Sequence, residues 1–104
     1  LVIWTGEFGR LPVSQNGLGR DHNRYAFTSL LAGGGFKGGH VHGATDEFGY
    51  KAMDDLVSCP DLLATVLNQM GLDHDRLRFR HSGREETLTD SPVTGAAVVE
   101  SILS

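Results

Sequence analysis

The first five residues constrain the fold of this chain most strongly. They form an apolar run, Leu1-Val2-Ile3-Trp4-Thr5, which ends at Gly6. The run does not alternate between apolar and polar residues, as a strand with one face in solvent would. Such runs are typical of strands that are covered on both faces, as in parallel sheets flanked by helices. The run therefore predicts a buried parallel strand and an α/β fold.

The composition is that of a globular chain without a basic surface. Of the 104 residues, 39% are hydrophobic and 21% are charged, and the formal net charge is −4. Because nucleic acids and anionic membranes attract basic patches, this charge disfavours both as partners. No apolar segment reaches the roughly 18 residues that a membrane span requires. The single cysteine, Cys59, excludes an internal disulfide and a cysteine zinc cluster.

The chain begins directly on the apolar run, without a polar lead-in. Natural termini are usually polar and loosely held. We therefore expect residues 1–104 to be the C-terminal portion of one larger domain.

The rest of the sequence predicts short strands and one well-defined helix. Strands are expected over residues 25–32, 40–43 and 77–81, with a loop over 44–57, and the tail 96–103 favours neither helix nor strand. A helix is expected over residues 60–70, because Pro60 suits the first helical position and Gly71 suits a left-handed C-cap. Its apolar stripe consists of Leu62, Leu63, Val66, Leu67 and Met70.

Glu7 follows the first predicted strand and is the first candidate site residue. In open α/β sheets, binding sites form just beyond the carboxyl ends of the strands. A carboxylate in that position can bind a hard metal ion or act as a base. Arg10, three residues on, can bind an anion. The alternative is a structural ion pair between Glu7 and Arg10.

A second candidate segment, Arg20-Asp21-His22, precedes the strand predicted over residues 25–32. Aspartate and histidine are ligands for zinc or manganese, and Arg20 suits an anionic substrate group. The alternative role for Asp21 is to cap a turn.

Three further motifs carry less functional information. Residues 33–38 match the spacing G-x-G-x-x-G, but no helical pattern follows, so a dinucleotide site is rejected and a glycine-rich turn is expected. His40 and His42 have metal-capable spacing on one face of the predicted short strand, although two histidines without a nearby carboxylate more often lie on an exposed strand edge. Cys59 lies near a helix N-terminus, where a reactive thiol and a packing residue are both possible.

Several motifs in order resemble one bacterial family. They are Thr5-Gly6-Glu7-Phe8-Gly9, Gly19-Arg20-Asp21-His22, Gly33-Gly34-Gly35-Phe36-Lys37, Asp61-Leu62-Leu63-Ala64-Thr65 and Leu88-Thr89-Asp90. The resembled family is the domain-of-unknown-function family numbered fifteen-oh-one, which is sulfatase-like and placed in the alkaline-phosphatase superfamily. The resemblance covers nearly the whole chain.

The resemblance implies a fold, a site and an activity. The implied fold is the C-terminal part of an alkaline-phosphatase/sulfatase-like sandwich, with a mostly parallel sheet between helices. The implied site binds divalent metal, zinc or calcium, through Glu7 and His22, with Asp21 as a ligand or its support. Arg10 and Arg20 would hold the anionic group of a small-molecule or glycan ester. The nucleophile would lie outside this chain. Members of the family often begin with a twin-arginine export signal, which implies a periplasmic or cell-surface protein.

One departure from the superfamily pattern leaves two functions open. Phe8 stands where the resembled enzymes keep a histidine ligand. The first hypothesis is a metal-dependent hydrolase of sulfate or phosphate esters, in which the 104-residue chain alone is inactive. The alternative is a non-catalytic, exported binding or scaffold relative. Neither the substrate nor the oligomeric state follows from the sequence.

Overall fold

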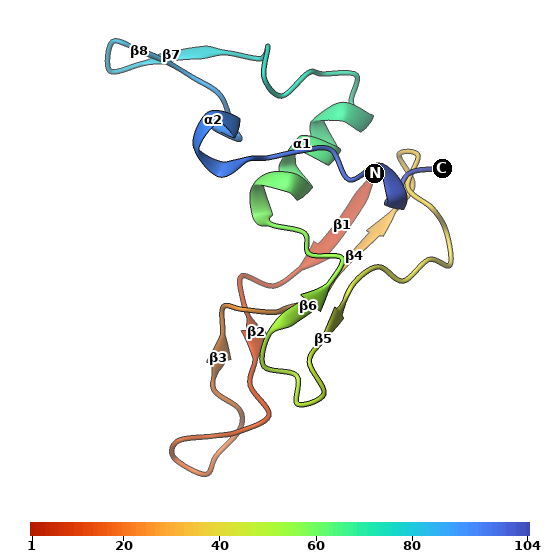
Figure 1. The fold of residues 1–104 in the computed structure, drawn as a ribbon, viewed down its shortest axis with the longest axis vertical. Helices are drawn as coiled ribbons and strands as arrows, with labels where there is room; N and C mark the ends of the chain where they lie inside the picture. The colour runs from red at the N-terminus through yellow and green to blue at the C-terminus, as the bar shows by residue number, and fades with distance from the viewer. The chain divides into compact units, whose positions relative to one another are not determined.

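The computed structural model describes residues 1–104 and divides them into two units. The N-terminal unit is Leu1–Leu56, and the C-terminal unit is Val57–Ser104. Figure 1 shows that strand pairs make up the first unit, whereas the second contains the helices. No helix has both the length and the apolar content that crossing a membrane demands.

The N-terminal unit consists of three antiparallel strand pairs. They are β1 (Val2–Thr5) with β4 (Ser29–Ala32), β2 (Gly9–Arg10) with β3 (His22–Asn23), and β5 (Ala44–Thr45) with β6 (Ala52–Asp54). In the first pair, Val2 lies opposite Ala32 and Thr5 lies opposite Ser29. The side-chain hydroxyls of Thr5 and Ser29 are 2.6 Å apart, which adds a hydrogen bond at the end of this ladder.

The pairing of β1 contradicts the predicted fold class. The alkaline-phosphatase/sulfatase-like sandwich required a parallel sheet between helices, whereas every strand pair here is antiparallel. The predicted burial is also wrong, since Val2 is 65% exposed and Trp4 is 71% exposed. Parallel neighbours need a crossover, usually a helix, but the connection from β1 to β4 contains the β2–β3 pair and no helix. Branched and aromatic residues thus favoured a strand. They did not determine whether the strand pairs in parallel or whether other elements cover its faces.

The predictions for residues 40–57 are also corrected. Residues 40–43 form no strand, and the expected loop over 44–57 contains the β5–β6 pair. Asp46 organises the turn, because its carboxylate accepts hydrogen bonds from the backbone N–H groups of Phe48, Tyr50 and Lys51 at 2.9–3.1 Å. The hydrogen bond from Tyr50 is the main cause that lowers the pKa of Asp46. The turn formers and acids therefore belong to a hairpin turn.

The predicted helix is confirmed as α1 (Cys59–Gln69). Ser58 is the N-cap: its side chain accepts from the backbone N–H of Asp61, and the Asp61 carboxylate accepts from the backbone N–H of Ser58. This capping box satisfies two backbone donors at the helix start. At the other end Gly71 has φ +79°, and Leu72 N–H donates to the Leu67 carbonyl at 2.9 Å. These are the features of a Schellman C-cap.

Helix α1 holds the C-terminal segment of its unit through two side chains. Thr65 is fully buried, and its Oγ1 accepts from the backbone N–H of Val99 at 2.9 Å. Asp61 Oδ1 accepts from the backbone N–H of Ala97 at 3.0 Å. The remaining elements are β7 (Phe79–His81) paired with β8 (Arg84–Glu86), α2 (Ser91–Thr94) and the 3₁₀ helix η1 (Glu100–Ile102). The tail therefore ends in a short 3₁₀ turn.

Asp61 makes the stability of the C-terminal unit depend on pH. Burial raises the pKa of this carboxyl, but the hydrogen bonds from Ser58 and Ala97 outweigh burial and lower it. A carboxyl with a lowered pKa in the folded state stabilises fully above its unfolded-state pKa and loses that contribution as pH falls through the folded-state value. We expect Asp61→Asn to destabilise the unit by about 1 kcal/mol at pH 7.

The pH series supplies the check on this prediction. Urea unfolding from pH 7 down to about pH 2 should show the difference between wild type and Asp61→Asn shrinking below about pH 4. Asp54→Asn is the matched control, since it removes an exposed carboxylate that makes no hydrogen bond or ion pair. A pH-independent difference for Asp61→Asn would show that the carboxylate charge is not what stabilises this cap.

Candidate functional site

The β2–β3 pair brings the two predicted site segments together. Arg10 lies opposite His22 in the register. The pairing continues outward, because Leu11 N–H donates to the Asp21 carbonyl at 2.8 Å and Asp21 N–H donates to the Val13 carbonyl at 3.0 Å. Arg10 therefore lies beside Asp21 and His22, whereas Glu7 precedes the paired residues.

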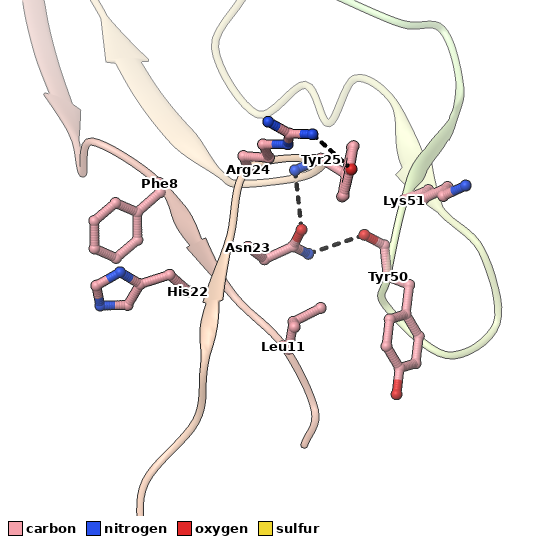
Figure 2. A pocket seen from close by; sticks show the side chains of 8 residues that line it. All are labelled: Phe8, Leu11, His22, Asn23, Arg24, Tyr25, Tyr50 and Lys51. Carbon is pink, nitrogen blue, oxygen red and sulfur yellow. Dashed lines mark hydrogen bonds between the residues drawn. The ribbon is translucent and has the colours of Figure 1, made fainter. Parts of the chain in front are cut away.

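His22 is held by an aromatic contact. Its ring stacks on Phe8 with centroids 3.8 Å apart and an interplanar angle of 28° (Figure 2). The guanidinium carbon of Arg10 lies 5.3 Å from the centre of the Phe8 ring, within the range of a cation–π contact. Phe8 is thus a support for the neighbouring histidine and arginine, a role that the sequence did not reveal.

Glu7 and Arg10 do not form the alternative ion pair. The Arg10 guanidinium instead donates to the carbonyl of Arg20 at 3.2 Å. The Glu7 side chain is exposed and has no hydrogen bond or ion pair. The carboxylate of Glu7 therefore remains available to a ligand.

Asp21 is engaged within its own loop. Its two carboxylate oxygens accept from the backbone N–H of Gln15 at 3.1 and 3.2 Å. The carboxylate closes the turn between β2 and β3, which is the turn-capping role considered above. A cavity of about 460 Å³ adjoins it, with Arg10, Arg20 and His22 on its wall.

The predicted ligands do not form a complete metal site within this chain. No group of three or more His, Cys, Asp or Glu side chains lies where one ion could be held. The side chains of Glu7 and His22 have atoms that are free to bind a metal ion. The carboxylate of Asp21 already accepts hydrogen bonds from the backbone N–H of Gln15. Away from this segment, the rings of His40 and His42 lie 5.9 Å apart with no third ligand.

A buried asparagine in β3, Asn23, connects this segment to Tyr25 and to the turn between β5 and β6. Asn23 is 2% exposed; its Nδ2 donates to the Tyr50 carbonyl at 2.9 Å, and its Oδ1 accepts from the Tyr25 N–H at 2.9 Å. Ala52 N–H donates to the Tyr25 carbonyl at 3.2 Å. Hydrogen bonds thus hold both the backbone N–H and the backbone carbonyl of Tyr25. Sequence reasoning missed Asn23, because one asparagine in a polar loop gives no signal of burial.

Two cations flank the ring of Tyr25 (Figure 2). Arg24 donates from Nη2 to the phenol oxygen at 2.9 Å, and its guanidinium carbon lies 4.9 Å from the ring centre. The ammonium of Lys51 lies 5.7 Å from the same ring centre. The hydrogen bond from Arg24, followed by its charge, lowers the pKa of Tyr25. These residues line a second cavity of about 510 Å³ together with Phe8 and His22.

Comparison with known proteins identifies the family. No curated protein and no solved structure matches the chain significantly. The sequence model of one family, described as "Protein of unknown function (DUF1501)", matches residues 1–103. The chain therefore belongs to the DUF1501 family of proteins of unknown function.

Proposed function

We propose that this chain forms part of a metal-dependent hydrolase that acts on sulfate or phosphate esters. The proposal starts from the motifs around Glu7 and His22 that resemble sulfatase-like enzymes, and it does not depend on their fold. The observation that carries it is the β2–β3 register, in which Arg10 lies opposite His22. Glu7 precedes β2 and keeps an exposed carboxylate without a hydrogen bond or ion pair. An arginine and a histidine thus lie opposite one another on this ladder, and a solvent-exposed glutamate precedes it.

The proposed roles follow from the chemistry of each side chain. Glu7 and His22 offer two ligand atoms for a divalent ion such as zinc or calcium, and ligands outside this chain would complete the site. Arg10 and Arg20 attract and orient the anionic group of a small-molecule or glycan ester. Phe8 restricts the rotation of the His22 ring through their stack. The nucleophile would likewise come from outside residues 1–104.

The test is ester hydrolysis together with metal content, measured on the full-length exported protein. Wild type should contain metal and cleave an aryl sulfate or aryl phosphate. Glu7→Gln should lose metal and lower kcat/KM on the order of 100-fold, because a neutral amide is a much poorer ligand. Glu47→Gln, an exposed glutamate in the β5–β6 turn, is the matched control. Metal-free protein with background turnover in all three forms would refute the proposal.

The second candidate is a non-catalytic binding relative. The observation that favours it is the Phe8–His22 stack, which occupies the position of a ligand that the resembled enzymes use. This candidate predicts binding of an anionic ester without turnover. Detection of a covalent intermediate, or of turnover that depends on Glu7, would exclude it.

A further inference from the structure

We propose that Arg24 and Tyr25 form a binding site for a tetrahedral oxyanion, such as a phosphate group. Neither residue belongs to the proposed metal site, although their cavity also reaches Phe8 and His22, and binding here requires no hydrolysis. It arises from the hydrogen bond of 2.9 Å between the two side chains and from the charge around them. The proposal can therefore hold whether or not the protein is a hydrolase.

The direction of that hydrogen bond leaves a donor free. An arginine guanidinium carries only donors, so the phenol oxygen of Tyr25 must be the acceptor. The hydroxyl hydrogen of Tyr25 is then left to point elsewhere, and no acceptor within the chain receives it. Tyr25 is 55% exposed, so a ligand from solvent can reach this hydrogen.

The charge around the phenol favours an anion. Arg24 and Lys51 both contact the Tyr25 ring, and neither forms an ion pair with a carboxylate. Positive charge that is not neutralised by the protein attracts anions from solution. The hydrogen bond from Arg24, and after it the charges of Arg24 and Lys51, lower the pKa of Tyr25. A more acidic phenol is a better hydrogen-bond donor to an oxyanion.

The backbone holds the site in place before a ligand arrives. The buried side chain of Asn23 fixes the N–H of Tyr25, and Ala52 fixes its carbonyl. Preorganised donors lose less entropy on binding than flexible ones. An oxyanion would accept from the Tyr25 hydroxyl and from the unused N–H groups of Arg24, with Lys51 adding charge. The adjoining cavity of about 510 Å³ can take an organic group attached to the oxyanion.

Tyr25 can be followed directly in full-length protein labelled with ¹³C-tyrosine. The ring signals that Tyr25→Phe removes are those of Tyr25. Inorganic phosphate is added at constant ionic strength, with chloride as the balancing anion. We expect a saturable shift of the Tyr25 ring signals and a rise in the pKa of Tyr25, because a bound anion disfavours the phenolate.

Matched variants separate binding at this site from general screening. Arg24→Gln should weaken phosphate binding on the order of tenfold, as expected for the loss of a charge-assisted hydrogen bond. Arg80→Gln changes the net charge equally within β7 and should leave binding unchanged. Tyr25→Phe, followed by calorimetry, should weaken binding severalfold without disturbing the fold, since the ring remains.

A second ligand distinguishes the source of the oxyanion. Phenyl phosphate binding more tightly than inorganic phosphate would indicate a monoester that also uses the cavity, whereas equal binding would indicate a free oxyanion. Either result supports the proposed chemistry. A shift of Tyr25 that is non-saturable, or that is the same in wild type and Arg24→Gln, would overturn it.

Discussion

Replacing Gly9 with alanine is expected to destabilise the N-terminal unit on the order of 3 kcal/mol. A Cβ atom on Gly9 would lie 2.0 Å from the carbonyl oxygen of Ala26 and 3.1 Å from the Cβ of Phe27. A backbone carbonyl cannot rotate away as a flexible side chain could, so the two segments must separate. Because Gly9 pairs with Asn23, this separation would also disturb the ladder that carries Arg10 and His22.

Urea unfolding of Gly9→Ala measures this effect, with Gly6→Ala as the matched control. The nearest atom to a Cβ on Gly6 is the Phe8 carbonyl oxygen at 3.4 Å, an ordinary contact. Gly6→Ala should therefore stay within about 0.5 kcal/mol of wild type. Equal stability of the two variants would show that the close approach of Ala26 to β2 does not exist in solution.

Replacing Asn23 with alanine is expected to cost about 2–3 kcal/mol. The substitution leaves the Tyr25 N–H and the Tyr50 carbonyl without the partners that the amide supplies at 2.9 Å. Buried polar groups that lose their partners keep the full cost of their desolvation. The contact between β3 and residues 49–50 would loosen, and Tyr25 would lose one of its two backbone anchors.

Thermal unfolding followed by circular dichroism checks this prediction. Asn68→Ala is the matched control, because Asn68 is exposed near the end of α1 and its amide contacts only its neighbour Gln69. The control should change stability by less than about 0.5 kcal/mol. If Asn23→Ala melts at the same temperature as wild type, water replaces the hydrogen bonds of the amide without a loss of stability.

Local chemistry in the sequence predicted the helix well. The stop signal at Gly71 and the apolar stripe through Leu67 act within a few residues, and α1 ends as they indicate. The strand predicted over residues 77–81 is also present in part, as β7. Such elements are predictable because the interactions that define them are short-range.

The sheet could not be predicted in the same way. The apolar run at residues 1–5 indicated a strand, but its partner, direction and exposure depend on residues 29–32 and on the path between them. Pairing over a long separation follows from the whole chain and not from the composition of one segment. The parallel sandwich was wrong for this reason.

The candidate site was predicted in part. Glu7, Arg10, Arg20, Asp21 and His22 were named from their residue types and spacing. The β2–β3 pair places Arg10 opposite His22, and the function of these residues stays a prediction. The stack of Phe8 on His22 and the burial of Asn23 depend on the register of that pair. The contact of Lys51 with Tyr25 joins residues 26 positions apart and has no counterpart in local sequence.

A metal titration of the full-length protein tests the proposed function most directly. Zinc or calcium is added while the ring signals of His22, assigned with His22→Gln, are followed by NMR. The proposal predicts that these signals shift and saturate at one equivalent, and that Glu7→Gln weakens this binding about 10- to 100-fold. If the His22 signals do not change at saturating metal, and wild type and Glu7→Gln behave in the same way, Glu7 and His22 do not share a metal site.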